Sequence, residues 1–169
     1  LKDVQWVEQQ LPFIHIRFLK TDDAQHVILN GEDVERDIRT LEIGNLASEV
    51  STIGSVRRFL VAQQQAMGTE KGIVMDGRDI GTVVLPDAEL KIFLTASAQE
   101  RARRRFIEFK EKGVETDFET VLGDIIERDR NDSTREIAPL KPAEDSVFMD
   151  TSDMSLEESV AAVERLVRE

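Results

Sequence analysis

The stretch Lys71-Gly-Ile-Val-Met-Asp-Gly-Arg-Asp-Ile-Gly-Thr-Val-Val84 decides how the fold is interpreted. Its apolar run at residues 72–75 predicts a buried strand, and the polar tetrapeptide 76–79 follows directly. In open α/β sheets, ligands bind beyond the carboxyl ends of the strands. There, Asp76 can hold a Mg²⁺-bound water, and Arg78 can bind a phosphate through two hydrogen bonds. A plain turn, with its glycine relieving backbone strain and its charges facing water, explains the same residues.

A second charged segment runs from Glu127 to Arg135 and follows a predicted helix with apolar residues at helical spacing (Phe118, Val121, Leu122, Ile125, Ile126). On a continuing helix, Arg128, Asp132 and Arg135 would fall at i, i+4 and i+7 and share one face. Two guanidinium groups flanking a carboxylate suit a sugar phosphate, with arginine for the phosphate and aspartate for hydroxyl or amine donors. A solvated charged face is the alternative.

A third group of charges, Arg101, Arg103, Arg104 and Arg105, forms a basic island in an acidic chain. Arg101, Arg104 and Arg105 fall at i, i+3 and i+4, so we expect them on one side of a helix. The whole chain has 22 basic and 34 acidic residues and a net charge of −12, which argues against binding to nucleic-acid polymers. The island is either an anion site or a solvated helix face.

Composition narrows the class of protein. A chain of 169 residues fits one domain with a sizeable core. It has no cysteine and only two histidines, His15 and His26, which argues against disulfides and against Cys- or His-based metal sites. No apolar run approaches the ~18 residues of a membrane span, and nothing resembles a signal peptide. We expect an intracellular, cytoplasmic enzyme without membrane association.

Local patterns predict the order of elements. Strands are expected at 13–18 and 26–29 with an Asn30-Gly31 hairpin turn, and helices from Thr40 to about Met67. Further strands are expected at 72–75, 90–94 and 146–150. Three capping boxes predict helix starts, at Ser97–Glu100, Thr116–Glu119 and Ser155–Glu158, and the last helix should span 156–168.

These motifs together resemble bacterial cytidylate kinase, a nucleoside-monophosphate kinase of the P-loop class. The resemblance covers essentially the whole chain and rests on several segments: Asp76–Val84, Leu90–Ser97, Glu100–Arg105, Glu127–Arg135, Ala138–Leu140, Ile28–Val34 and Asp37–Thr40. It implies a P-loop kinase-type parallel sheet flanked by helices. Residues of about 12–40 would form a small antiparallel insert on the nucleoside-monophosphate side, and 41–67 the helices of the acceptor site. Residues 72–96 and 146–169 would form the core, and 97–137 the helices that bear a mobile lid.

The resemblance also implies an acceptor site for CMP or dCMP. Ser48, Arg57 and Asp79 match the positions that read the cytosine edge, with the carboxylate accepting from the exocyclic amine. Four other residues match positions that bind the rest of the nucleotide: Arg78 and Arg135 the phosphate, Arg128 and Asp132 the sugar. Asp76 matches the carboxylate at the Mg²⁺ end of the site, and Arg101, Arg104 and Arg105 match lid arginines that face the transferring phosphoryl group. The implied reaction is in-line transfer from ATP to CMP, with Mg²⁺ bound alongside ATP.

The chain departs from the family in one respect. The family opens with a strand, a Gly-rich phosphate loop and a helix, and no G-x-x-x-x-G-K-[ST] occurs in these residues. We therefore expect a truncated kinase domain over 1–169, lacking a first βαβ unit of ~30 residues and inactive by itself, while the intact enzyme would be a monomer. Two alternatives stay open: a catalytically dead CMP-binding or interaction module, and a phosphatase with an aspartate nucleophile. The phosphatase motif D-x-D-G-T is not matched, because Asp76 and Asp79 are three residues apart.

Overall fold

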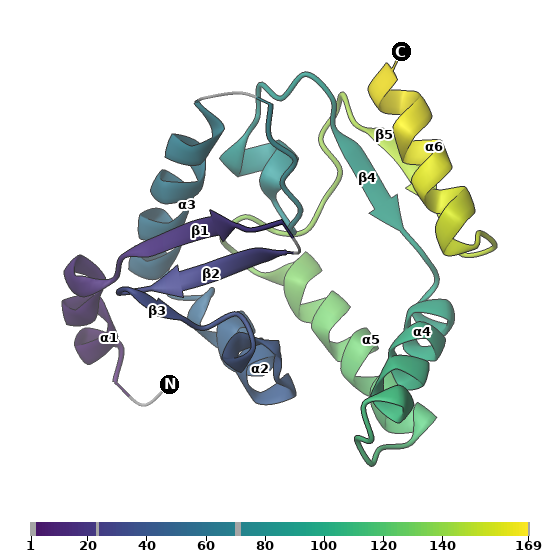
Figure 1. Ribbon diagram of the computed structural model, residues 1–169, viewed down its shortest axis with the longest axis horizontal. Coiled ribbons are helices and arrows are strands. Elements are labelled where there is room, and N and C mark those ends of the chain that lie inside the picture. The colour runs from purple at the N-terminus through teal and green to yellow at the C-terminus, as the bar shows by residue number, and fades with distance from the viewer. Residues whose placement is uncertain (1–2, 23, 70–71, 169) are drawn as a thin grey trace. The chain divides into compact units, whose positions relative to one another are not determined.

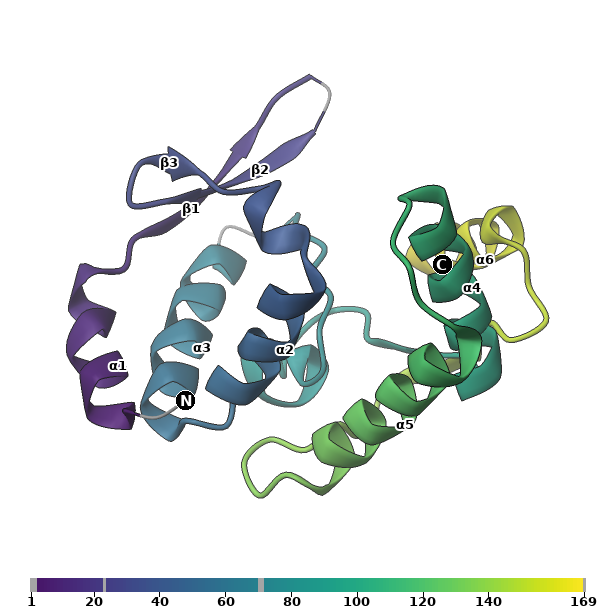
Figure 2. The ribbon, with the colours of Figure 1, turned by 90° about the horizontal axis from the view of Figure 1, so that it is seen from below.

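The computed structural model describes residues 3–22, 24–69 and 72–168 (Figures 1 and 2). The chain divides into two compact units, residues 1–69 and 70–169. One antiparallel sheet and one parallel strand pair, both accompanied by helices, confirm the predicted α/β class. The single-domain organisation stays a prediction.

The first unit contains the predicted antiparallel strands. After α1 (Val4–Gln10) come β1 (Ile16–Lys20), β2 (Gln25–Leu29) and β3 (Glu32–Asp33), which form a sheet in the order β1-β2-β3. Asn30 and Gly31 join β2 to β3 with φ values of 51° and 95°, as a type I′ hairpin turn requires. The turn prediction is confirmed. The first strand begins three residues later than expected, because Leu11–Phe13 forms a 3₁₀ turn that contains a proline.

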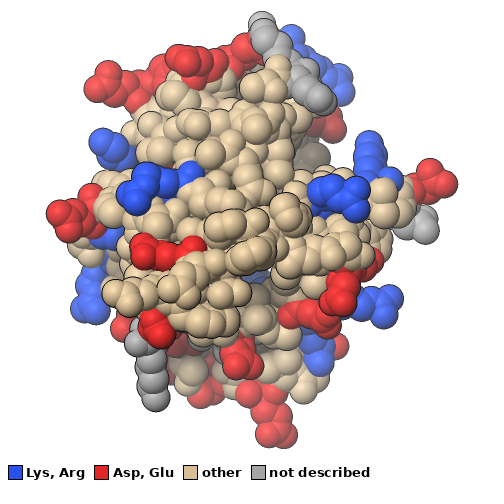
Figure 3. Space-filling view, turned by 90° about the vertical axis from the view of Figure 1, so that its left-hand side faces the viewer, with Lys and Arg blue, Asp and Glu red and all other residues tan. Residues whose placement is uncertain are grey.

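Two further helices complete the first unit, as predicted. They are α2 (Leu41–Val50) and α3 (Gly54–Gly68), and the Thr40 side chain caps α2 by accepting from the backbone N–H of Ile43 at 3.2 Å. The Ser55 hydroxyl on α3 donates to the Glu8 carboxylate on α1 at 2.6 Å. Figure 3 shows a broad uncharged area with charged side chains mostly around it.

The second unit is built on two parallel strands. β4 (Ile92–Thr95) pairs with β5 (Val147–Asp150) in the register Ile92↔Val147, and the rings of Phe93 and Phe148 stack at 5.7 Å. The helices are α4 (Ala98–Glu111), α5 (Phe118–Thr134) and α6 (Leu156–Arg168). The predicted apolar face of α5 packs on α4 in a shared core, while its last member, Ile126, is 52% exposed.

One predicted strand is wrong. Residues 72–76 form no strand, and Val74 is fully exposed; Lys71, which opens the same stretch, lies outside the described residues. An apolar run becomes a strand only where another strand accepts its ladder of hydrogen bonds. In the described part of the chain, β4 has β5 alone as its neighbour.

The predicted capping boxes have three different outcomes. At Ser155–Glu158 both reciprocal bonds form, at 2.8 and 3.2 Å. Ser97 caps α4 as predicted, but the Glu100 carboxylate binds arginines instead of returning to the Ser97 N–H. The third cap is Asp117 rather than Thr116, because the Asp117 carboxylate accepts from both the N–H and the hydroxyl of Thr120.

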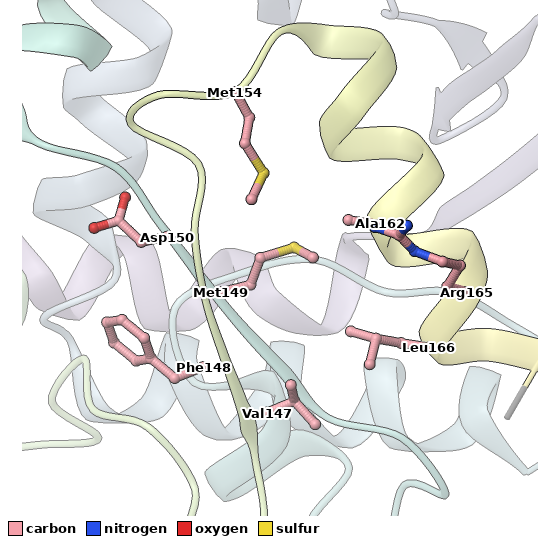
Figure 4. A pocket seen from close by; sticks show the side chains of 8 residues that line it. All are labelled: Val147, Phe148, Met149, Asp150, Met154, Ala162, Arg165 and Leu166. Carbon is pink, nitrogen blue, oxygen red and sulfur yellow. The ribbon is translucent and has the colours of Figure 1, made fainter.

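A hollow of about 340 Å³ lies between β5 and α6. The four residues of β5, Met154 and three residues of α6 line it, and the side chains of Met149, Met154 and Leu166 point into it (Figure 4). None of the predicted site residues lines this hollow. Every helix in the described ranges is too short or too polar to span a lipid bilayer.

Candidate nucleotide-binding site

A buried carboxylate organises the predicted sugar-phosphate residues. Asp132 lies near the end of α5 with its side chain 7% exposed, and Arg78 donates to it through Nε at 2.8 Å. Arg128 Nε lies 3.9 Å from Asp132 Oδ2, and Arg135 Nη1 lies 3.8 Å from Asp132 Oδ1. The structure therefore brings together four residues that the sequence placed in one site.

Arg135 reaches this carboxylate from beyond the helix. The sequence placed it on a continuing helix, but α5 ends at Thr134 and Arg135 is extended, with φ −62° and ψ 143°. Its Nε donates to the Ala138 carbonyl at 2.7 Å, and the Leu140 N–H donates to the Asp132 carbonyl at 2.8 Å. The loop after α5 thus folds back on the helix end and fixes the guanidinium group.

Ala138 holds Arg135 in place, a role that the sequence analysis did not assign to it. Its φ of 48° lies in the left-handed region, which costs a non-glycine residue about 1 kcal/mol or more. This conformation directs the Ala138 carbonyl to Arg135. Ala138 was part of the family-like segment Ala138–Leu140, but a residue before proline is expected to be extended, so neither signal predicted its left-handed backbone.

Asp79 joins the same cluster through Arg135. Its side chain is 11% exposed, and its Oδ1 lies 4.0 Å from Arg135 Nη2. The Asp79 carbonyl begins a π-helical turn (Ile80–Val84), in which it accepts from the Val83 N–H at 2.9 Å. Val84, 2% exposed, anchors that turn. Such π-turns are frequent at functional sites, and this one holds the backbone of Asp79 in place.

The cluster is locally basic in an acidic chain. The guanidinium groups of Arg78, Arg128 and Arg135 face the carboxylates of Asp79 and Asp132, a net charge of +1. Arg78 and Arg128 are about half exposed, at 43% and 53%, so a ligand in solvent can reach them. Guanidinium groups in this arrangement suit bidentate binding of a phosphate.

Asp76 is exposed in the loop that leads to Arg78. Among residues 3–22, 24–69 and 72–168, no three His, Cys, Asp or Glu side chains form a potential metal site. A single exposed carboxylate still fits Mg²⁺ in one common mode, in which waters and substrate phosphates provide most of the ligands. Asp76 therefore fits only as one ligand of a Mg²⁺ brought with a nucleotide.

The three arginines predicted for the lid diverge. Arg101 forms two bonds to Asp129 on α5, at 2.9 and 2.6 Å. Arg104 donates to the Thr151 carbonyl at 2.7 Å and to Glu100 at 2.8 Å. Arg105 binds Glu108 one turn along its own helix and stacks over the Phe109 ring at 4.5 Å. Helical spacing predicted a shared side but not these separate partners.

The two remaining predicted residues lie in the first unit. Ser48, on α2, and Arg57, on α3, are both half-buried. The predicted cytosine-reading group of Ser48, Arg57 and Asp79 is thus divided between the two compact units. Its assembly around a base stays a prediction.

The fold and the cluster define a mixed α/β protein with a site suited to an anionic ligand. The cytidylate kinase family profile matches residues 2–169, and the chain belongs to that family.

Individual proteins similar to this chain belong to the same family. A cytidylate kinase of Caldicellulosiruptor saccharolyticus is 54% identical over 83% of this chain and 62% of its own length. Those of Flavobacterium johnsoniae and Enterococcus faecalis are 50% and 49% identical, over 95% and 91% of this chain and 71% and 68% of their own lengths. The chain thus spans about two thirds of the length of these relatives.

Proposed function

We propose that the protein transfers a phosphoryl group from ATP to CMP or dCMP, giving the diphosphate. The observation that carries this proposal is the convergence of Arg78, Arg128 and Arg135 on the buried Asp132 carboxylate. Membership of the cytidylate kinase family supports the choice of substrate. The cluster offers positive charge and fixed donors to a monophosphate.

Each residue of the cluster has a distinct role in this proposal. Arg78 and Arg135 bind the phosphate of CMP, while Arg128 and Asp132 face the sugar. Asp132 also keeps the guanidinium groups oriented when no nucleotide is bound, because a buried carboxylate holds cations by charge and by hydrogen bonds. Preorganised donors of this kind lower the cost of ordering the site on binding.

Base selection is assigned to Asp79, Ser48 and Arg57. A carboxylate accepts from the exocyclic amine of cytosine, and uracil has a carbonyl at that position. Asp79 is nearly buried and its backbone is held by the π-helical turn, which supports the assignment. Ser48 and Arg57 would bind the carbonyl and ring nitrogen.

Catalysis in this reaction comes from positioning and from neutralising charge. Mg²⁺ bound with ATP neutralises phosphate charge, and Asp76 is the residue that would contact its water shell. Arg101, Arg104 and Arg105 are assigned to the transferring phosphoryl group. Each would first have to exchange a partner in the chain for the phosphate, because each is paired in this structure.

The 169 residues contain no Gly-rich phosphate loop, so we expect no ATP-dependent turnover from these residues alone. For the full-length gene product we propose a cytoplasmic monomer that acts on nucleotides and not on nucleic-acid polymers.

The family relation favours a kinase over an aspartate phosphatase. A CMP-binding module without catalysis is the second candidate, supported by the absence of the loop motif.

One assay separates the candidates. The full-length gene product is incubated with ATP, Mg²⁺ and CMP, dCMP, UMP or AMP, and ADP formation is measured. A kinase of this kind produces ADP with CMP or dCMP in preference to UMP and AMP. CMP binding in a titration without ADP formation would support the binding module instead.

A further inference from the structure

Lys91 is a buried cation outside the proposed nucleotide site. It lies directly before β4, and its side chain is only 8% exposed. Its Nζ binds both carboxylate oxygens of Asp145, at 2.9 and 2.7 Å, and also donates to the Pro86 carbonyl. The Lys91 ammonium holds the pKa of the Asp145 carboxyl below its ordinary value. Buried lysines are rare unless paired, so these partners account for its burial.

The side chain of Lys91 connects segments that are far apart in the sequence. Asp145 leads into β5, and Pro86 follows the π-helical turn. A Cβ atom added at Gly81, inside that turn, would lie 3.4 Å from Cδ and 3.5 Å from Cγ of Lys91. The aliphatic part of Lys91 therefore packs against the turn, while its ammonium group binds the carbonyl of Pro86, just beyond the turn.

The same turn begins at Asp79. The Asp79 carbonyl accepts from the Val83 N–H at 2.9 Å, and the Ile80 carbonyl accepts from the Leu85 N–H at 2.7 Å. Asp79 and Leu85 are thus the two ends of one hydrogen-bonded segment, and Pro86 follows directly. A shift at the Pro86 end is transmitted through these bonds to the backbone of Asp79.

We propose that Lys91 is a positioning residue for Asp79 and thereby sets the preference for cytosine over uracil. The inference rests on the proposed function, since it takes Asp79 as the base-reading carboxylate. Lys91 acts through the turn and does not contact the nucleotide. A hydrogen bond to a charged group is worth roughly 10- to 150-fold in affinity, and a carboxylate displaced from the cytosine amine loses part of that.

The experiment compares Lys91→Met with wild type in the full-length gene product. Methionine keeps an apolar stem and removes the ammonium group. Dissociation constants for CMP and for UMP are measured by calorimetry, and the UMP-to-CMP ratio is the readout. We expect this ratio to fall by about ten-fold in Lys91→Met, mainly through weaker CMP binding.

Three matched variants separate positioning from loss of stability. Lys91→Arg keeps a cation that can bind the Asp145 carboxylate, although with a larger and differently shaped group, and should restore part of the ratio. Asp145→Asn, at an exposed position, removes the ion pair but keeps the bond to Pro86, so it should lower the ratio by an intermediate amount. Ala162→Gly, at a buried position of α6, destabilises the same unit by the cost of glycine in a helix and should leave the ratio unchanged.

The outcomes are distinct. The positioning role is overturned if the UMP-to-CMP ratio stays within about two-fold of wild type in both Lys91→Met and Asp145→Asn. It is also overturned if Ala162→Gly changes the ratio as much as Lys91→Met does. If Lys91→Met does not fold, Asp145→Asn alone decides between these results. A wild-type protein that does not prefer CMP overturns the proposed function itself, and this inference with it.

Discussion

Two arginine-rich regions of the second unit were predicted alike and are built differently. In the first, Arg78 comes from one segment and Arg128 and Arg135 from another, and all three meet at one buried carboxylate. In the second, the basic island on α4, neighbouring arginines turn to separate partners. Helical spacing predicted a shared face for each group, and only in the first do the side chains meet at one carboxylate.

The two regions differ in how their arginines meet carboxylates. Asp132 is nearly buried and lies within 4 Å of three guanidinium groups, so the cations outnumber it and the cluster retains positive charge. On α4 each arginine has a carboxylate within reach on its own helix or on the next one. The island keeps a charge of +1 as well, because Arg103 and Arg104 share Glu100, but its guanidinium groups turn to separate partners, whereas those of the cluster converge on one carboxylate and can meet one anion.

The largest predicted effect is on Asp132. Asp132→Ala removes a nearly buried carboxylate from Arg135, which is 12% exposed, and from the half-exposed Arg78 and Arg128. Removing one partner of a buried pair costs about 3–5 kcal/mol, and solvent around the two half-exposed arginines keeps the loss toward the lower end of that range. We expect the free energy of unfolding, measured by urea denaturation, to fall by that amount in the full-length gene product. The control is Asp124→Ala on the exposed face of α5, expected to change stability by no more than about 0.5 kcal/mol. Equal losses in both variants would show that Asp132 is an ordinary helix residue.

The next prediction concerns base choice. Asp79→Asn should weaken CMP far more than UMP, because it removes a charged acceptor for the cytosine amine. The expected loss is about 1.5–3 kcal/mol, or roughly 10- to 150-fold in the dissociation constant of CMP. Titration calorimetry with both nucleotides measures it. Equal losses for CMP and UMP would refute the role assigned to Asp79.

A smaller effect is expected at Arg101, in the basic island. Arg101→Ala breaks a pair with Asp129, in which each side chain is about one third exposed, and a bond to the Ala96 carbonyl; we expect a loss of about 1 kcal/mol in unfolding free energy. CMP affinity should not change, whereas the rate of ADP formation should fall if the arginine meets the phosphoryl group. Arg103→Ala, which loses only the exposed bond to Glu100, serves as the control. A loss of CMP affinity in Arg101→Ala would place the island in the acceptor site.

The smallest effect is the pH response of the island. Hydrogen bonds from Arg103 and then Arg104 lower the pKa of Glu100 from 4.5 to about 2. Because the pKa of Glu100 is lowered in the folded state, its ionised carboxylate stabilises the fold. That stabilisation is complete above pH 4.5 and is lost as the pH falls toward about 2. The melting temperature of wild type should therefore approach that of Glu100→Gln across this window. Two curves that stay parallel there would show that the pair adds no stability.

Much of the fold could be predicted from local signals. Helix starts followed from caps such as Thr40 and Ser155, and the turn at Asn30 followed from its preference for positive φ. Residues 72–75 show the limit. Their apolar character predicted a strand, but pairing depends on a neighbouring strand, which local composition does not reveal.

The site was predictable in its members and not in its geometry. Asp132 and its arginines could be named from charge and spacing. The position of the Arg135 side chain could not, because it depends on a bond to the carbonyl of Ala138, whose backbone is left-handed. Long side chains on one helix face have many rotamers, so spacing alone could not tell that Arg101 would turn to α5 and Arg105 to its own helix. The direction of each arginine side chain is set by the groups that it meets in the folded chain.

The most direct test of the cluster as the phosphate-binding site compares CMP with cytidine, which lacks the phosphate. Arg78→Ala and Arg135→Ala are prepared in the full-length gene product, and both ligands are titrated by calorimetry. Each variant should weaken CMP by roughly 10- to 150-fold and leave cytidine within about two-fold of wild type. Equal weakening of CMP and cytidine would contradict the assignment and make these arginines structural.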